Sequence, residues 1–263
     1  MTEAQGGEWY EMPVVFGPSE LPEVTRMDDV CSVSIAFRTE AEAVAPLLPP
    51  WFQPLDPPVV TVVHSMLRKV DYLGGRGYNL VRVQVSAAYR GPAHEPIDAA
   101  YALVIWENDT RPIVLGRELG GYAKVFGDVT DLVATPDGHR FEVAEDGARL
   151  LDGEVSGLVP VTGDALAAQQ AAARTSVSLG WKYVPGLGKE PDVDYPTKLT
   201  SHAELTELWT GAGSVRFARP DRAQAPVGAR IVERLGRLPV LEVLPATLVR
   251  GSSTLPRRAV VRL

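Results

Sequence analysis

The chain has 263 residues, of which 45% are hydrophobic and 22% charged, and this composition is typical of an ordered globular protein. The net charge of −7 argues against nucleic acid and acidic membranes as main partners, and no apolar run approaches the roughly 18 residues of a membrane span. The lone cysteine, Cys31, excludes an internal disulfide. The first residues lack the apolar core of a secretory leader, so we expect a cytoplasmic protein.

Short segments with strand character follow one another along most of the chain. They combine alternating or β-branched residues with flanking turn dipeptides such as Gly74-Gly75 and Asp152-Gly153. Their spacing favours antiparallel meanders over βαβ units, which need a helix after nearly every strand. The expected strands are 31–37, 59–64, 80–89, 100–106, 112–115, 141–143, 214–217, 238–243 and 259–263.

Few helices are expected between these strands. Thr39 and Glu42 suggest a capping box for a short helix that ends near Leu48. Asp164 is expected to cap a helix over 165–174, and a third helix could surround 117–126 despite its paired glycines. The predicted fold is α+β and mainly antiparallel β: a curved or closed sheet with a few short covering helices. We expect a single domain over 1–263, with 1–30 as an extended N-terminal arm.

Most familiar catalytic and cofactor motifs are missing. There is no G-x-x-x-x-G-K-[ST], H-E-x-x-H or G-x-S-x-G sequence. The four histidines are scattered, so no metal site is expected. His64 ends an expected strand and could be catalytic, although a half-buried structural histidine is the more ordinary interpretation. Cys31 is expected to be a small buried side chain.

Lys124 and Lys182 are the charged residues that look out of place. Lys124 follows Gly116-Arg117-Glu118-Leu119-Gly120-Gly121-Tyr122-Ala123, and Lys182 lies between Trp181 and Tyr183. From composition alone, such lysines more often keep their ammonium groups in water than act as nucleophiles.

Residues 107–125, ENDTRPIVLGRELGGYAKV, resemble the active-site segment of the acetoacetate decarboxylase-like superfamily, where a G-R-E-L-x-x-Y-x-K run ends in a Schiff-base lysine. Three later segments resemble the family in the same order: 181–186 with Pro191, 208–211, and 238–256. The resemblance implies a cone-like closed β-barrel with a buried apolar pocket and a homo-oligomeric assembly. It also implies chemistry without a cofactor or metal, through a covalent imine on Lys124.

The chemistry requires a lysine amine that has lost its proton. A free lysine is about 0.1% neutral or less at pH 7, and burial can lower its pKa by about 3–5 units. Such activation is established for acetoacetate decarboxylase itself. The imine is an electron sink for loss of CO2 from a 3-oxo acid, for proton loss from a 2-oxo acid and for aldol addition. Lys124 therefore predicts an intermediate and not a product.

The sequence departs from the decarboxylase pattern near this lysine. Val125 stands where the family has a second lysine, and the strands that carry its two pocket glutamates offer Val63 or His64, and Leu80. These departures favour aldol condensation with dehydration, or cyclisation, in a biosynthetic pathway. The substrate would be a small oxo acid, with an aldehyde as a candidate co-substrate. Acetoacetate decarboxylation and a non-catalytic small-molecule-binding barrel remain the alternatives.

Such chemistry also needs a proton shuttle and a carboxylate anchor. Tyr122, His64 and Glu107 are candidates for the shuttle. Arg117 and Arg250 are candidates for the anchor. A structural ion pair or a surface charge is the competing interpretation for each of these residues.

Overall fold

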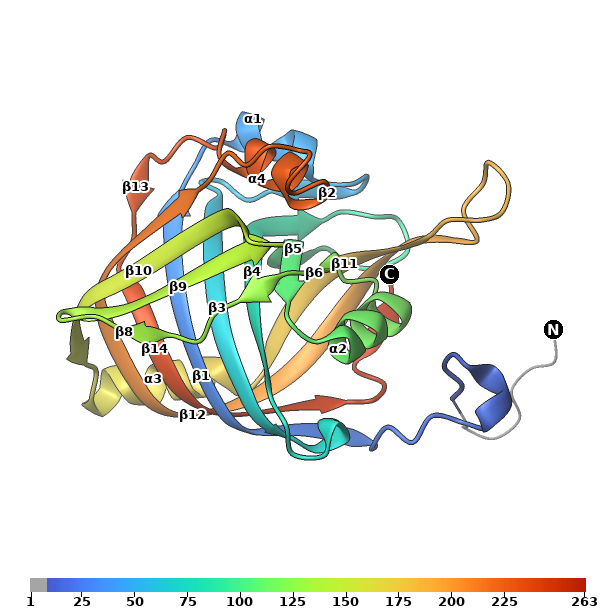
Figure 1. Ribbon diagram of the computed structural model, residues 1–263, viewed down its shortest axis with the longest axis horizontal. Coiled ribbons are helices and arrows are strands. Elements are labelled where there is room, and N and C mark those ends of the chain that lie inside the picture. Colours follow the sequence, from blue (N-terminus) through green and yellow to red (C-terminus); the bar gives the residue numbers. More distant parts are fainter. Residues whose placement is uncertain (1–8) are drawn as a thin grey trace.

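The computed structural model describes residues 9–263, which form a mostly antiparallel β-sheet with few helices (Figure 1). Ten of its strands are hydrogen-bonded in the order β11 (Ser176–Val184), β5 (Ile97–Glu107), β4 (Tyr78–Tyr89), β3 (Val59–Val70), β1 (Val24–Arg38), β14 (Ala246–Pro256), β12 (Val193–Phe217), β10 (Ala148–Pro160), β9 (Gly138–Glu145) and β7 (Asp128–Val129). Short strands pair beside this path: β2 (Phe52–Pro54), β6 (Lys124–Phe126), β8 (Val133–Ala134), β13 (Glu242–Val243) and β15 (Val260–Arg262).

Strand β11 pairs with β12 as well as with β5. The pairings therefore run in a ring from β11 through β5, β4, β3, β1, β14 and β12 back to β11. The prediction of a mainly antiparallel sheet with few helices is confirmed. The cone-like closed barrel stays a prediction, and this ring of pairings supports it.

The helices lie around the sheet. Figure 1 shows α1 (Ala41–Val44) and α4 (Gly228–Leu235) together at one end, with α3 (Gly163–Ala173) towards the other. Helix α2 (Thr110–Leu115) and a π-helical turn, η4 (Gly116–Gly120), follow β5. Three 3-10 turns complete the set: η1 (Val14–Phe16), η2 (Ala45–Leu47) and η3 (Asp71–Leu73). No helix formed by residues 9–263 is both long and apolar enough to cross a membrane.

One face of the sheet forms the main hydrophobic core. Alternate residues of β1, such as Val33 and Ile35, are buried on this face because successive side chains of a strand point to opposite sides. Strands β9 and β10 cross in front of β1 and β3 in Figure 1 and cover this face together with α4. The core includes Val62, Val83, Trp106, Phe141, Leu151 and Val232.

The opposite face of the sheet, called the lysine face below, carries two neighbouring rows of side chains. The register between the strands shows which residues belong to each row. Cross-strand partners point to the same side of a sheet, so each row can be followed from strand to strand. One row contains Ser65, Leu80 and Glu107, and the next contains Val63, Arg82, Ile105 and Lys124.

The local structure differs from expectation in two segments around the lysine. Residues 112–115 were expected as a strand and belong instead to α2, whose N-cap Asp109 accepts a hydrogen bond from the Arg111 backbone N–H. The helix expected around 117–126 is shorter than predicted: it is the π-helical turn η4, which ends at Gly120 because Gly121 adopts φ +68°, and β6 then begins at Lys124.

Four other expectations need smaller corrections. The N-cap of α1 is Glu40, and the buried Thr39 hydroxyl forms no cap. The N-cap of α3 is Thr162, while Asp164 lies in the first turn, where its charge favours the helix dipole. Of 238–243 only Glu242–Val243 is a strand. The expected N-terminal arm gives way to β1 at Val24, and its residues 1–8 lie outside the described part of the chain.

Candidate active site

Lys124 and Glu107 meet where the parallel strands β5 and β6 lie side by side. Lys124 Nζ forms an ion pair with Glu107 Oε1 at 2.8 Å and donates a hydrogen bond of 3.0 Å to the Pro112 carbonyl oxygen. The Glu107 side chain is fully buried, and that of Lys124 is 14% exposed. The two residues therefore form a buried ion pair on the lysine face.

The residues that precede Lys124 explain how the chain builds this pair. Gly116 leaves the space through which the lysine side chain passes, since a Cβ there would overlap Lys124 Cε. Arg117 Nη1 donates a 2.9 Å hydrogen bond to the Lys124 carbonyl oxygen, which fixes the backbone. Gly121, with its positive φ, lets the turn approach the Lys182 backbone, where a side chain would not fit. These three residues therefore position the lysine side chain, and we assign them no part in its chemistry.

Burial controls the electrostatics of the pair. Loss of hydration raises the pKa of the Glu107 carboxyl above its usual range, and the positive charge of Lys124 opposes that shift. An ion pair in such a medium is less stabilised relative to its neutral form than the same pair in water. The Glu107 carboxylate therefore lies beside the Lys124 ammonium in surroundings that disfavour its charged form.

Tyr122 lies two residues before Lys124 and packs against Ala102 and Ile105. Its hydroxyl is 2.7 Å from Ser178 Oγ. Burial raises the pKa of Tyr122 to about 12, so the phenol keeps its proton at neutral pH. It can donate or accept a hydrogen bond but is a poor general base.

Two further tyrosines, Tyr72 and Tyr78, are close enough to Glu107 for its charge to affect them, and the sequence reasoning missed them. The Tyr72 and Tyr78 hydroxyls interact with each other, and the charge of Glu107 acts on both. Burial raises the pKa of Tyr78, and the nearby Glu107 carboxylate raises it further. No motif marks these residues. The alternation of β4 could have placed Tyr78 on the same face as Leu80.

The structure does not bring His64 to Lys124. His64 Nε2 lies 2.8 Å from the Thr130 carbonyl oxygen, and the ring packs against Phe141 in the main core, with ring centroids 4.8 Å apart. Burial lowers the pKa of His64 to about 4, so the imidazole is neutral. Because His64 follows Val63 in β3, it points to the face opposite the lysine.

The two arginines expected as carboxylate anchors also have other partners. Arg117 is exposed and binds the lysine backbone, as described above. Arg250 lies on β14 opposite Cys31, and its Nε is 3.8 Å from Glu207 Oε2. No contact joins Arg250 to Lys124 among residues 9–263. Cys31 itself is buried, as expected.

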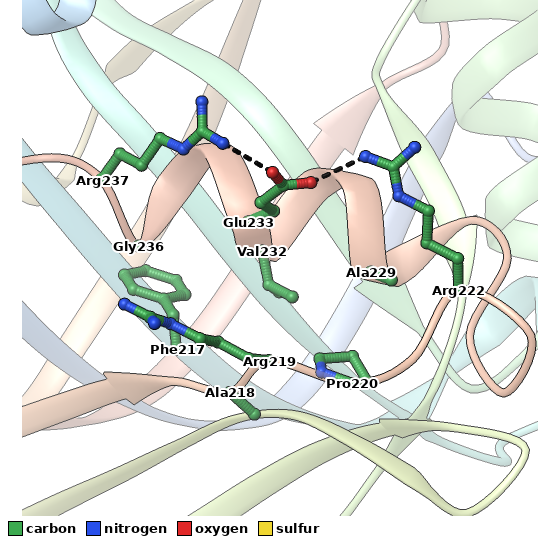
Figure 2. A pocket seen from close by; sticks show the side chains of 10 residues that line it. All are labelled: Phe217, Ala218, Arg219, Pro220, Arg222, Ala229, Val232, Glu233, Gly236 and Arg237. Carbon is green, nitrogen blue, oxygen red and sulfur yellow. Dashed lines mark hydrogen bonds and ion pairs between the residues drawn. The ribbon is translucent and has the colours of Figure 1, made fainter.

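A separate surface hollow of about 460 Å³ lies between α4 and the end of β12 (Figure 2). Figure 2 shows Glu233 bridging two arginines, Arg222 at 2.8 Å and Arg237 at 2.6 Å. Neither Lys124 nor Glu107 lines this hollow. Within residues 9–263 no group of three or more histidine, cysteine, aspartate or glutamate side chains is arranged to hold a metal ion.

Comparison with known proteins places this geometry in context. Residues 11–262 match the family described as acetoacetate decarboxylase (ADC). A curated relative, Decarboxylase DEC1 of Cochliobolus heterostrophus, is 25% identical over 234 residues, which cover 86% of this chain and 83% of that protein.

Two solved structures show the same fold. The acetoacetate decarboxylase of Legionella pneumophila superposes with a TM-score of 0.74 at 18% identity, covering 99% of this chain and 98% of that one. The enduracididine biosynthesis enzyme MppR, complexed with pyruvate, superposes with a TM-score of 0.70 at 19% identity, covering 98% of each chain. At these identities the likeness concerns the fold alone.

Proposed function

Because the chain belongs to the acetoacetate decarboxylase family, we propose that it is a cofactor-free lyase that forms an imine between Lys124 and a small oxo acid. The observation that carries this proposal is the buried contact of 2.8 Å between Lys124 Nζ and Glu107 Oε1. It supplies both a nucleophile and a partner that can move its protons.

Imine formation needs two proton transfers that Glu107 can perform. The carboxylate first takes one proton from the Lys124 ammonium, and Nζ then attacks the carbonyl carbon of the substrate. The carbonyl π electrons move to oxygen, which receives the proton from Glu107. The carboxylate next takes a second proton from the nitrogen and delivers it to the hydroxyl, which leaves as water. An iminium with one proton on nitrogen remains, and Glu107 is again a carboxylate.

For the steps after the iminium we favour aldol condensation with dehydration, or cyclisation. On the lysine face, strands β3 and β4 present Val63 and Leu80, where the resemblance to the decarboxylase would place acids. A 2-oxo acid iminium can lose a proton from the neighbouring carbon, and the resulting enamine can attack an aldehyde. MppR, which has this fold, is described in complex with pyruvate and with the condensation product of pyruvate and imidazole 4-carboxaldehyde.

Decarboxylation of a 3-oxo acid is the second candidate. The description of the matched family and the name of the relative DEC1 favour it. In that reaction the bond to the carboxyl group breaks, CO2 leaves, and the electron pair moves into the iminium.

Reductive trapping tests the proposal. Borohydride added with pyruvate or acetoacetate should attach the reduced substrate to Lys124, as peptide mass spectrometry would show, and Lys124→Ala should abolish the adduct. Release of CO2 from acetoacetate would select the second candidate. Binding of an oxo acid without any adduct would indicate the non-catalytic alternative, and activity that survives Lys124→Ala would refute the imine. We also propose that the protein is a homo-oligomer, which sedimentation would test, and that it is cytoplasmic, which cell fractionation would test.

A further inference from the structure

Arg82 is a partly buried arginine that forms no hydrogen bond or ion pair with any of residues 9–263. Its Nε is inaccessible to solvent and has no partner. Desolvation lowers the pKa of the guanidinium, and the Tyr122 phenol is the titratable group that interacts with it. A guanidinium stays charged in proteins, and a charge removed from water is costly unless an anion accompanies it.

The register places Arg82 and Lys124 in the same row of the lysine face. Arg82 on β4 pairs with Ile105 on β5, which pairs with Lys124 on β6. Two strand spacings separate their Cα atoms by about 10 Å, and both side chains are long enough to reach towards one small molecule between them. Their functional groups can therefore act on the same ligand.

The neighbours of Arg82 leave its charge uncompensated. Val63 lies opposite it on β3, and Leu80 lies two residues before it on β4. The nearest acid of the two rows is Glu107, which is already paired with Lys124. The side chain keeps partial access to solvent although protein surrounds most of it. A small anion that enters this face could therefore bind a guanidinium that has no partner among residues 9–263.

We propose that Arg82 binds the carboxylate of the oxo acid whose carbonyl carbon reacts with Lys124, and so makes the site specific for oxo acids over neutral ketones and aldehydes. The proposal rests on the proposed imine chemistry for the identity of the ligand. A planar guanidinium presents two parallel N–H donors that match a carboxylate, and apolar neighbours strengthen that interaction. Arg82 thereby takes the role for which the sequence suggested Arg117 or Arg250.

The test compares pyruvate with acetone, which has the same methyl ketone but no carboxylate, in borohydride trapping. Arg82→Gln should raise the pyruvate concentration for half-maximal labelling by about 30-fold or more, because a charged pair is lost. Labelling by acetone should not change. Arg82→Lys, which keeps the charge but not the fork, should show a smaller loss. Arg216→Gln, which removes an exposed arginine paired with Asp152, is the matched control and should leave both substrates unaffected.

A second measurement separates this proposal from the imine chemistry. Lactate has a carboxylate but no carbonyl, so calorimetric titration measures its binding without any reaction. Wild-type protein should bind lactate, and Arg82→Gln should not, with circular dichroism confirming that the variant folds. If lactate binding depends on Arg82 while no adduct forms at Lys124, the imine proposal fails and the anion site stands. Pyruvate labelling or lactate binding that is equal in wild type and Arg82→Gln would overturn the anion site.

Discussion

Two glutamates form ion pairs with basic side chains in different surroundings. One is Glu107, in the buried pair on the lysine face, and the other is Glu233 of α4, in a surface cluster with Arg222 and Arg237. Glu107 is fully buried beside Lys124, whereas the Glu233 side chain is 42% exposed between Arg222 and Arg237. Their carboxyl pKa values move in opposite directions. Burial raises that of Glu107, and the hydrogen bond from Arg222, followed by the charge of Arg237, lowers that of Glu233.

The difference shows that the medium, and not the presence of a cation, decides what such a pair can do. Water screens the Glu233 cluster, so its carboxylate is stable and the contacts contribute little. The buried pair lacks that solvation, which brings the charged and neutral forms closer in free energy. The proposed imine formation requires a proton to move between Glu107 and Lys124, and this difference in medium favours the transfer at the buried pair.

Removing the buried acid should have the largest effect. Glu107→Gln keeps the size of the side chain but cannot exchange a proton, so the rate of borohydride-trapped imine formation should fall by about 100-fold or more. Glu233→Gln is the matched control and should label at the wild-type rate. A Glu107→Gln protein that labels as fast as wild type would show that the carboxylate takes no part.

The pH dependence of the same reaction sharpens the comparison. Protonation of Glu107 in acid leaves both members of the pair protonated and the amine blocked. Because burial raises the pKa of this carboxyl, wild-type labelling should fall as the pH decreases while still above the 4.5 of an ordinary glutamate. The Glu107→Gln protein should lack this decrease.

His64 extends the comparison to a buried group whose hydrogen-bond partner is a backbone carbonyl oxygen. Here the expected effect is on the stability of the protein and not on its reactivity. Its pKa is about 4 in the folded protein and about 6.5 in the unfolded chain, so the unfolded state binds the extra proton between these values. As the pH falls from 6.5 to 4, this group should lower the free energy of unfolding by about 3 kcal/mol.

Urea denaturation across that pH range measures the effect. His64→Gln should remove this part of the slope. Val62→Ala, a core control on the same strand, should lower stability while leaving the slope in place. Equal slopes for wild type and His64→Gln would contradict the assignment of His64 as a neutral core residue.

The surface cluster should show the smallest effect. Replacing Glu233 by glutamine breaks contacts that solvent already weakens, so the melting temperature should change by about 2 °C or less. Differential scanning calorimetry at low and high salt would measure it. A larger decrease would mean that the cluster stabilises α4 more than an exposed ion pair ordinarily does.

Much of the sheet could be predicted because its signals are local. The alternation of 31–37 and 80–89 predicts strands with one buried face, and β1 and β4 contain them. Residues 112–115 misled the prediction because Ile113 and Val114 favour strands, whereas the Asp109 cap starts a helix just before them. The Gly121 turn likewise ends the predicted helix for a reason that is visible only in its backbone conformation.

Within the site, local sequence singled out the lysine but not all of its neighbours. The run that ends at Lys124 predicts the amine proposed to react, and Glu107 was among three candidate shuttles. Tyr78 and Arg82 have no motif around them, because their surroundings come from strands distant in the chain. Alternation along β4 placed them on one face, but which strands flank that face is not a local property.

By itself, the sequence determined the strand-rich fold class and singled out Lys124 through the run of residues that ends at it. The tertiary structure alone decided that Glu107, and not His64, meets the amine, and that Arg82 shares its row. The physical reason is the two-residue repeat of a strand: neighbours such as Val63 and His64 point to opposite faces, and only the register between strands decides which side chains share one.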